Sequence, residues 1–298
     1  MTDEILHVED LNLWIVNGKD EIHIVHDASF VVRRGERWGI AGESGAGKSM
    51  MMKAVAALLP DGSTRMTGRI LYRMPDGSWQ DLLELPYDKR HAFVSERVAV
   101  IFQDSIHALN PNERIRKQWG DTVRLHHPRV SKQVCEQHLL QQMDVFGIRG
   151  GAATLNSYPH QLSGGMRQRI AIAMALESQN GFNGDASAGT DSKSAAGAAG
   201  FGHGGIIIAD EPTTSLDSMT QRAVVDYIKD ISASGQKTLL YVSHNLGVLQ
   251  YICDKLMVLK DGVIVEQGAA DDLYFRAKHP YTRQIVGETL KIMGREVM

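Results

Sequence analysis

The sequence predicts an α/β protein with a mostly parallel core sheet, an antiparallel β subdomain and a helical subdomain. Four short runs, β-branched and apolar on both faces, are typical of strands buried in a parallel sheet. Two Asp-Gly pairs between apolar runs, at residues 76–77 and 261–262, are typical of antiparallel hairpins. The pattern between Asn110 and Leu176 is helical instead.

Composition limits the class of protein. The chain has 298 residues, 43% of them hydrophobic and 22% charged, which is ordinary for a globular protein. Its net charge of −3 lacks the positive excess expected of a nucleic-acid binder. The two cysteines have no metal-like spacing, so we expect a reducing compartment. We find no signal peptide and no apolar run long enough to cross a bilayer, so any membrane role would come through a partner.

Each of the four apolar runs ends in a polar group. The runs are residues 37–41, 98–102, 206–209 and 239–242; they lead respectively into a glycine loop, Gln103, Asp210-Glu211 and Ser243-His244. In open α/β sheets, ligands bind beyond the carboxyl ends of the strands. We therefore expect these four groups to meet at one edge of one sheet.

Other segments are expected to lie outside that parallel sheet. The N-terminal stretch and the hairpins within residues 70–83 and 256–265 predict antiparallel strands. Residues 179–205 differ from the rest, because glycine, alanine and serine supply 17 of these 27 residues. Such a segment cannot bury enough apolar surface to offset its ordering entropy. We expect a flexible surface loop with an end-to-end span of roughly 30 Å.

The sequence GESGAGKS matches the phosphate-loop pattern G-x-x-x-x-G-K-[ST]. A predicted strand precedes it and a predicted helix follows it, as the motif requires. Lys48 is expected to reach the β- and γ-phosphates of a nucleotide, and Ser49 to bind Mg²⁺. The candidate nucleotide-binding residues of this loop are Gly42, Glu43, Ser44, Gly45, Ala46, Gly47, Lys48 and Ser49, followed by Met50.

The acidic strand end supplies the second half of a nucleotide site. Asp210 is expected to hold Mg²⁺, and Glu211 to orient or deprotonate the attacking water. His244 follows another strand of the predicted site, which favours a γ-phosphate contact over a capping role. Gln103 ends a third strand and is a candidate for both the metal and the γ-phosphate.

Residues 162–166, LSGGM, form a second candidate phosphate site. They precede an apolar helical run, and a helix N-terminus with bare N–H groups attracts anions. As a plain helix entry, the segment would have Ser163 as its N-cap. The sequence thus contains two phosphate cradles.

Taken together, these motifs resemble the ATP-binding subunit of ABC transporters, a family with a phosphate-loop ATPase fold. The order is the family's: phosphate loop, Gln103, LSGGM, ADEP, a Ser-Leu-Asp turn and His244. GESGAGKS, YPHQLSGGMRQR, ADEPTTSLD and HPYT at residues 279–282 are similar to the oligopeptide, dipeptide and nickel importer group. The insert at 179–205 and the short tail after HPYT depart from that group.

The resemblance implies that two ATPase chains sandwich ATP and Mg²⁺ between one chain's phosphate loop and the other's LSGGM. Ser163, Gly164 and Gly165 would then contact the γ-phosphate of the partner's ATP, and Asp217 would lie at the dimer seam. The family's adenine-stacking aromatic has two candidates here, Trp14 and His23. The partner chain can be identical or homologous.

The resemblance also implies a peripheral ATPase on the cytoplasmic face of the membrane, coupled to two permease subunits and indirectly to a substrate-binding protein. Within one domain, 1–298, we expect a nucleotide-binding core with its antiparallel part (1–104 and 206–276), a helical subdomain (105–178), the insert (179–205) and a short tail (277–298). A soluble ABC-type ATPase acting on ribosomes or DNA and a non-hydrolysing subunit are the alternatives. Peptides, nickel or other metal chelates, and sugars stay open as cargo.

Overall fold

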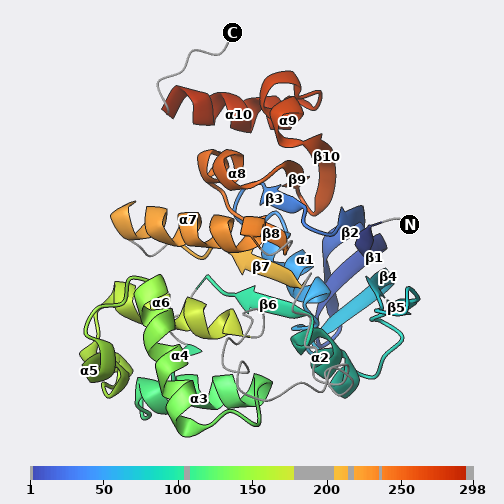
Figure 1. The fold of residues 1–298 in the computed structure, drawn as a ribbon. Coiled ribbons are helices and arrows are strands. Elements are labelled where there is room, and N and C mark those ends of the chain that lie inside the picture. The colour runs from blue at the N-terminus through green and yellow to red at the C-terminus, as the bar shows by residue number, and fades with distance from the viewer. Residues whose placement is uncertain (1–2, 104–107, 178–204, 214–217, 235–236, 293–298) are drawn as a thin grey trace.

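A computed structural model describes residues 3–103, 108–177, 205–213, 218–234 and 237–292 (Figure 1). In this part of the chain the central sheet has six strands in the order β10-β9-β3-β8-β7-β6. Their bounds are β3 (Arg37–Ala41), β6 (Val98–Ile101), β7 (Ile206–Asp210), β8 (Thr238–Val242), β9 (Lys255–Lys260) and β10 (Val263–Ala269). All neighbouring pairs are parallel except β9 and β10. The predicted mostly parallel core sheet is confirmed.

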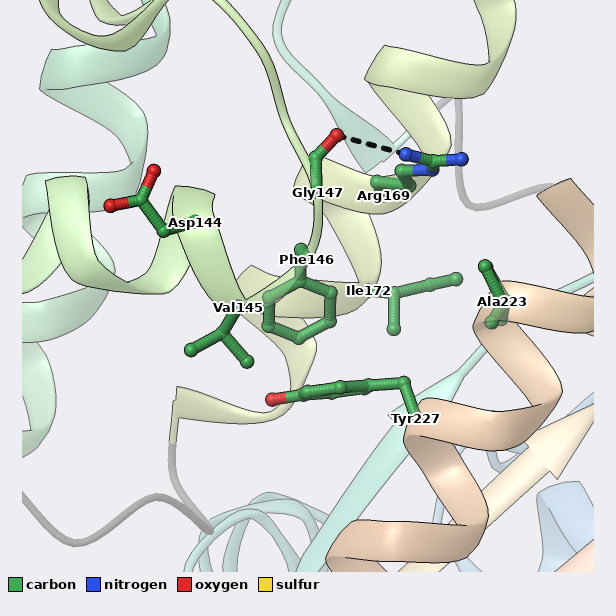
Figure 2. Close-up of a pocket in the computed structure, with 9 residues that line it drawn as sticks. Asp144, Val145, Phe146, Gly147, Arg169, Ile172, Ala223 and Tyr227 are labelled. Carbon is green, nitrogen blue, oxygen red and sulfur yellow. Dashed lines mark hydrogen bonds between the residues drawn. The ribbon is translucent and has the colours of Figure 1, made fainter.

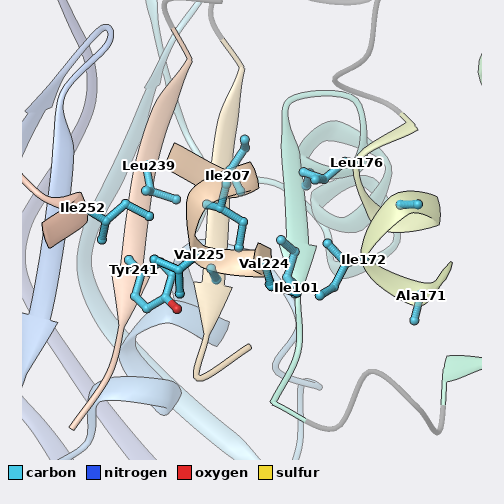
Figure 3. Packing of buried hydrophobic residues seen from close by; sticks show 14 of the residues in the cluster. Ile101, Ala171, Ile172, Leu176, Ile207, Val224, Val225, Leu239, Tyr241 and Ile252 are labelled. Carbon is cyan, nitrogen blue, oxygen red and sulfur yellow. The ribbon is translucent and has the colours of Figure 1, made fainter. Parts of the chain in front are cut away.

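Buried side chains alternate between the two faces of this sheet. Ile207, Leu239 and Tyr241 belong to one hydrophobic cluster, whereas Ile206, Ile208 and Leu240 belong to another. Figure 3 shows the first cluster, where α6, α7 and α8 cover the strands. Because both faces are covered, every residue of β7 and β8 is buried, and the strands lack polar alternation.

A second sheet, antiparallel and four-stranded, packs on the other face of the core sheet, where the second hydrophobic cluster joins both sheets to α1 (Lys48–Val55). Its order is β2-β1-β4-β5, with bounds β1 (Glu4–Asn17), β2 (Asp20–Arg33), β4 (Thr64–Arg73) and β5 (Trp79–Asp81). The two predicted Asp-Gly hairpins are confirmed, as β4–β5 and β9–β10. In the second of them Asp261 and Gly262 both have positive φ, 47° and 81°, as a tight hairpin turn requires.

The helices between β6 and β7 form a block beside the β6 edge of the core sheet (Figure 1). They are α3 (Ile115–His126), α4 (Lys132–Val145), α5 (Gly151–Leu155), the 3₁₀ turn η2 (Pro159–Gln161) and α6 (Gly164–Ala175). Buried Glu177, which follows α6, joins α3 and α4, because it accepts from the indole of Trp119 in α3 at 2.6 Å and lies 2.9 Å from His138 Nε2 in α4. The predicted helical segment is confirmed.

The remaining helices surround the core sheet. They are α2 (Tyr87–Ser95), α7 (Ser218–Ser234), α8 (Leu246–Ile252), α9 (Ala270–Arg276) and α10 (Pro280–Ile292). None of the helices in the described ranges is long and apolar enough to cross a membrane. The predicted loop 179–205 lies outside the described residues except for Gly205, whose carbonyl accepts from the Thr238 N–H at 3.1 Å. The residue boundaries given above for the subdomains stay a prediction.

The helical block meets the core at a pocket of about 190 Å³ (Figure 2). Phe146, which follows α4, contacts Tyr227 of α7 with ring centroids 3.9 Å apart and the rings tilted by 49°. Arg169 of α6 donates to the Gly147 carbonyl at 2.9 Å. None of the residues that line this pocket is a predicted site residue, so the candidate chemistry lies elsewhere.

Candidate functional site

The four polar strand ends meet, as predicted. Ser49 Oγ, at the start of α1, donates to Asp210 Oδ1 at 2.8 Å. The next carboxylate, Glu211, has Gln103 Nε2 at 3.5 Å from one oxygen and His244 Nδ1 at 3.1 Å from the other. Groups that follow β3, β6, β7 and β8 therefore form one connected set at the carboxyl edge of the core sheet.

The phosphate loop fits its surroundings only with glycine at two positions. Gly42 has a φ of 144°, and a Cβ there would lie 2.3 Å from the Leu259 carbonyl of β9. Gly47 has a φ of 92°, and its Cβ would lie 2.8 Å from the Ile24 carbonyl of β2. The loop is thus wedged between two strands.

The rest of the loop presents backbone to an anion. Gly47 is the N-cap of α1 and provides no side-chain cap, so the first amides of the helix are left for a ligand. Ser44 and Gly45 are exposed, and a Cβ on Gly45 would meet nothing within 4 Å. Ala46 is buried and accepts from the Gly262 N–H at 3.2 Å, while Met50 packs against the core cluster.

Lys48 is buried and held on the loop's own carbonyls. Its Nζ donates to Gly42 O at 2.7 Å and to Glu43 O at 2.6 Å. Burial lowers the pKa of Lys48, and the carboxylates of Glu211, Asp210 and Glu43 oppose that shift. The ammonium therefore donates to two neutral carbonyls. Phosphate oxygens could replace them, because a hydrogen bond between two charged groups is stronger.

Asp210 and Glu211 have different environments. Burial raises the pKa of Asp210, although the Ser49 hydroxyl bond acts in the opposite direction. Glu211 has a φ of 45°, a strained value for a residue other than glycine, and its N–H donates to the Val242 carbonyl at 3.0 Å. The strained turn ends β7 and leaves the Glu211 carboxylate between Gln103 and His244.

Oxygen ligands at this edge suit Mg²⁺. The Ser49 hydroxyl and the Asp210 carboxylate are adjacent, and Mg²⁺ prefers oxygen ligands while keeping several waters or phosphate oxygens. No group of three or more His, Cys, Asp or Glu side chains suited to a metal occurs among the described residues. The hydroxyl and carboxylate beside the phosphate loop fit Mg²⁺ bound together with phosphate oxygens.

The second candidate phosphate site lies in the helical block. Ser163 is the N-cap of α6, its Oγ accepting from the Met166 N–H at 3.3 Å, and a Cβ on Gly164 would meet open space. Figure 1 shows α6 away from α1. In the described ranges no hydrogen bond joins Ser163, Gly164 or Gly165 to the phosphate loop. The two cradles of one chain do not combine into one site.

Both aromatic candidates belong to one row of rings across the antiparallel sheet. Trp14 stacks on His23 with centroids 4.2 Å apart, and the Arg65 guanidinium lies 3.6 Å from the Trp14 ring. His26 continues the row, 3.8 Å from His23. His26 also lies against Gly262, whose N–H contacts the phosphate loop. Sequence reasoning missed His26, and the residue that stacks on adenine stays a prediction.

Two further polar residues near the site, Gln168 and Tyr281, were not predicted from the sequence. Gln168 is fully buried in α6, and its Nε2 donates to the carbonyl of Pro212, the residue after Glu211. A single amide among the apolar residues of α6 was its only sequence signal. Tyr281, within HPYT, contacts the Glu43 N–H of the phosphate loop. Asp217 lies outside the described residues.

Comparison with known proteins decides the family. The sequence model of the ABC transporter family matches residues 25–183, more than half of the chain. The chain belongs to the ABC transporter family. The matched range includes the phosphate loop, Gln103 and LSGGM, so the resemblance seen in the sequence is confirmed.

Within this ABC family the similar curated proteins are transport ATP-binding proteins. The dipeptide transport ATP-binding protein DppD of Bacillus subtilis (strain 168) is 32% identical over 99% of this chain and 80% of its own length. The metal-staphylopine import system ATP-binding protein CntD of Staphylococcus aureus (strain Mu50 / ATCC 700699) is 31% identical over 90% of this chain and 88% of its own.

Solved structures share the ABC ATPase fold. The dimeric ATP-binding cassette MJ0796, in a post-hydrolysis state with ADP and Pi, superposes with a TM-score of 0.69 at 21% identity, covering 89% of this chain and 99% of that one. The protein cbiO1 of Clostridium perfringens gives 0.67 at 22% identity over 98% of both chains. The predicted fold class, a mostly parallel sheet with antiparallel and helical subdomains, is that of an ABC ATPase.

Proposed function

We propose that this chain is the ATP-hydrolysing subunit of an importer for peptides or metal chelates. The names of its relatives support that cargo range, and family membership supports the ATPase. It would work at the cytoplasmic face of the membrane, bound to two permease subunits that receive cargo from a substrate-binding protein. Nucleic acid is not a partner in this proposal.

The observation that carries the chemistry is the position of the Glu211 carboxylate, between Gln103 and His244 and next in sequence to Asp210. Phosphoryl transfer to water needs mainly positioning and neutralisation of charge. Glu211 would orient the attacking water and accept its proton, while Gln103 and His244 hold the carboxylate and meet the γ-phosphate. Lys48 and the loop amides would bind the phosphate oxygens.

Mg²⁺ would be held by Ser49 and Asp210, and Gln103 is the third candidate ligand. When bound, the ion neutralises charge on the phosphates. The protein's own contribution is to place hydroxyl and carboxylate oxygens beside the loop, and the 2.8 Å bond between them keeps both in position.

The separation of the two cradles supports a paired mechanism. Ser163, Gly164 and Gly165 lie at an accessible helix N-terminus that does not contact its own chain's phosphate loop. We propose that these residues bind the γ-phosphate of ATP on a second ATPase chain, so that ATP closes the pair and hydrolysis opens it.

The test of this function is Glu211→Gln, which keeps the shape and hydrogen-bonding capacity of the side chain and removes its basicity. We expect ATP hydrolysis to fall by a factor of roughly 10² or more, with ATP still bound. The matched control is Glu96→Gln, an exposed carboxylate just before β6, at the opposite end of that strand from Gln103. Hydrolysis by the transporter complex that is unchanged in Glu211→Gln would overturn the role of Glu211.

The transport role has its own test. Affinity purification from membranes should recover permease subunits with the wild-type chain, whereas recovery with ribosomes or DNA would favour a soluble ABC-type ATPase. A strain that lacks the chain should lose uptake of either a labelled dipeptide or a labelled metal chelate. Loss of neither uptake would contradict the proposed cargo range.

A further inference from the structure

The side chain of Tyr281, at the start of α10, contacts the phosphate loop. Its hydroxyl accepts a hydrogen bond from the Glu43 N–H at 3.0 Å, and the residue is only 5% exposed. The Lys260 ammonium lies 5.1 Å from the centre of the tyrosine ring. Lys260 ends β9 at the turn where Gly262 donates to the loop carbonyl of Ala46. The tyrosine thus joins a hairpin that already supports the loop.

The turn that carries Tyr281 is itself fixed to the core sheet. Glu266 of β10 accepts from the N–H groups of Lys278 and His279, at 2.8 and 3.1 Å. The hydrogen bonds from these backbone groups lower the pKa of Glu266 against the opposing effect of its burial, so its carboxylate stays ionised. The chain is therefore anchored to the core sheet just before the loop contact.

One peptide group connects Tyr281 with Lys48. The peptide between Gly42 and Glu43 donates its N–H to Tyr281 Oη, and its carbonyl accepts from Lys48 Nζ at 2.7 Å. A peptide group is planar, so fixing the direction of the N–H also fixes the direction of the carbonyl. Without the tyrosine hydroxyl, this peptide group keeps only one of the two side-chain hydrogen bonds that fix its direction.

We propose that Tyr281 is a positioning residue for Lys48. Its hydroxyl holds the Gly42–Glu43 peptide, so that the lysine and the loop are already oriented for the phosphates of MgATP. This inference rests on the proposed nucleotide function. Tyr281 acts through the peptide group and Lys48, not on the reacting atoms. Its contribution is greatest before ATP binds, because bound phosphates would then hold the loop themselves.

The test compares two tyrosine variants of the full-length chain. Tyr281→Phe removes the hydroxyl on the loop; Tyr274→Phe is the matched control, because Tyr274 is also 5% exposed and its hydroxyl also bonds a backbone group, the Leu246 carbonyl. Loss of one hydrogen bond corresponds to about a fivefold change in affinity. We expect Tyr281→Phe to raise the Kd and KM for MgATP about fivefold, with kcat changed less than about twofold. Tyr274→Phe should leave Kd, KM and kcat near their wild-type values.

A second measurement needs no nucleotide. Hydrogen–deuterium exchange of the Glu43 amide should be faster in Tyr281→Phe than in Tyr274→Phe, at equal global stability. Equal MgATP affinities in the two variants, or an unchanged Glu43 exchange rate, would overturn the inference. Failure of the wild-type chain to bind MgATP would instead overturn the proposed function, so the two failures are distinguishable.

Discussion

At the scale of residues, the site brings together charges that burial disfavours. Lys48 and Asp210 are both nearly buried, and burial shifts the pKa of each toward its neutral form. Shifts of this kind are common at functional sites. A bound ligand of opposite charge would favour the ionised form of each group. Glu211 adds backbone strain at the same place. The apo chain therefore stores part of the free energy that a nucleotide and a metal would release.

Asp210→Asn should make the apo protein more stable at neutral pH. The folded-state pKa of Asp210 is raised by burial, so its ionised form costs stability at pH values above the raised pKa. Asparagine stays neutral and still offers an oxygen to Ser49. We expect a gain of up to about 1 kcal/mol in the free energy of unfolding, with ATP hydrolysis abolished.

The pH dependence checks the sign of that prediction. The gain should shrink as pH falls through the raised pKa, because the wild-type carboxyl then becomes neutral too. Asp226→Asn is the control, since hydrogen bonds from Tyr251 and Arg222 lower the pKa of this exposed aspartate. Denaturant unfolding at several pH values measures both variants. A gain with Asp226→Asn, or none with Asp210→Asn, would contradict the explanation.

At the scale of elements, the phosphate loop is shaped by its neighbours as much as by its own sequence. It passes between the Ile24 carbonyl of β2 and the Leu259 carbonyl of β9. The turn at Gly262 and the hydroxyl of Tyr281 hold it from the side of the C-terminal elements. Strands from both sheets therefore decide where the α1 N-terminus points.

Two glycine substitutions separate the effect of space from that of backbone angle. Gly42→Ala would place a Cβ 2.3 Å from a backbone oxygen, so we expect a loss of roughly 3–5 kcal/mol. Gly45→Ala has only its φ of 85° against it and open space around it, so we expect about 1–2 kcal/mol. Thermal and denaturant unfolding would measure both. Equal losses would mean that the wedge between the strands does not restrain the loop.

At the scale of the whole molecule, the two helix ends that are candidates for phosphate binding lie on separate subdomains. The phosphate loop belongs to the core, and the Ser163 end of α6 belongs to the helical block (Figure 1). Gln168 links that block to the turn after Glu211, since its amide donates to the Pro212 carbonyl. A movement of the helical block would therefore displace the turn that follows the proposed catalytic carboxylate of Glu211.

Ser163→Arg should separate binding from hydrolysis. The substitution adds a bulky cation at an exposed helix entry, where the loss of the N-cap costs about 1 kcal/mol. MgATP binding to the isolated chain should stay within about twofold of wild type, because one lost cap leaves the phosphate loop untouched. Hydrolysis by the paired chains should fall at least about tenfold, because the partner's γ-phosphate loses its cradle.

Mixing experiments localise the defect. Ser163→Arg chains paired with Lys48→Ala chains leave one composite site with both defects and one with neither. Each mixed pair should have about half of the activity of a wild-type pair if the two sites work independently. Loss of ATP binding by the isolated Ser163→Arg chain would show that the segment serves its own nucleotide instead.

The sequence by itself determined the elements whose signals are local. Buried parallel strands have apolar runs, hairpins have Asp-Gly turns, and the phosphate loop has a fixed spacing of glycine, lysine and serine. Strand ends that meet at one edge follow from topology alone, so the grouping of Ser49, Gln103, Asp210 and His244 around Glu211 could also be predicted.

Only the tertiary structure decided which distant residues touch these elements. Tyr281 meets Glu43 across 238 positions, Gln168 meets Pro212 across 44, and Trp14 stacks on His23 because β1 and β2 pair at that position. No local pattern encodes such contacts, because each depends on how two independently formed elements pack. The sequence thus determined the chemical groups of the site, and packing determined what holds them in position.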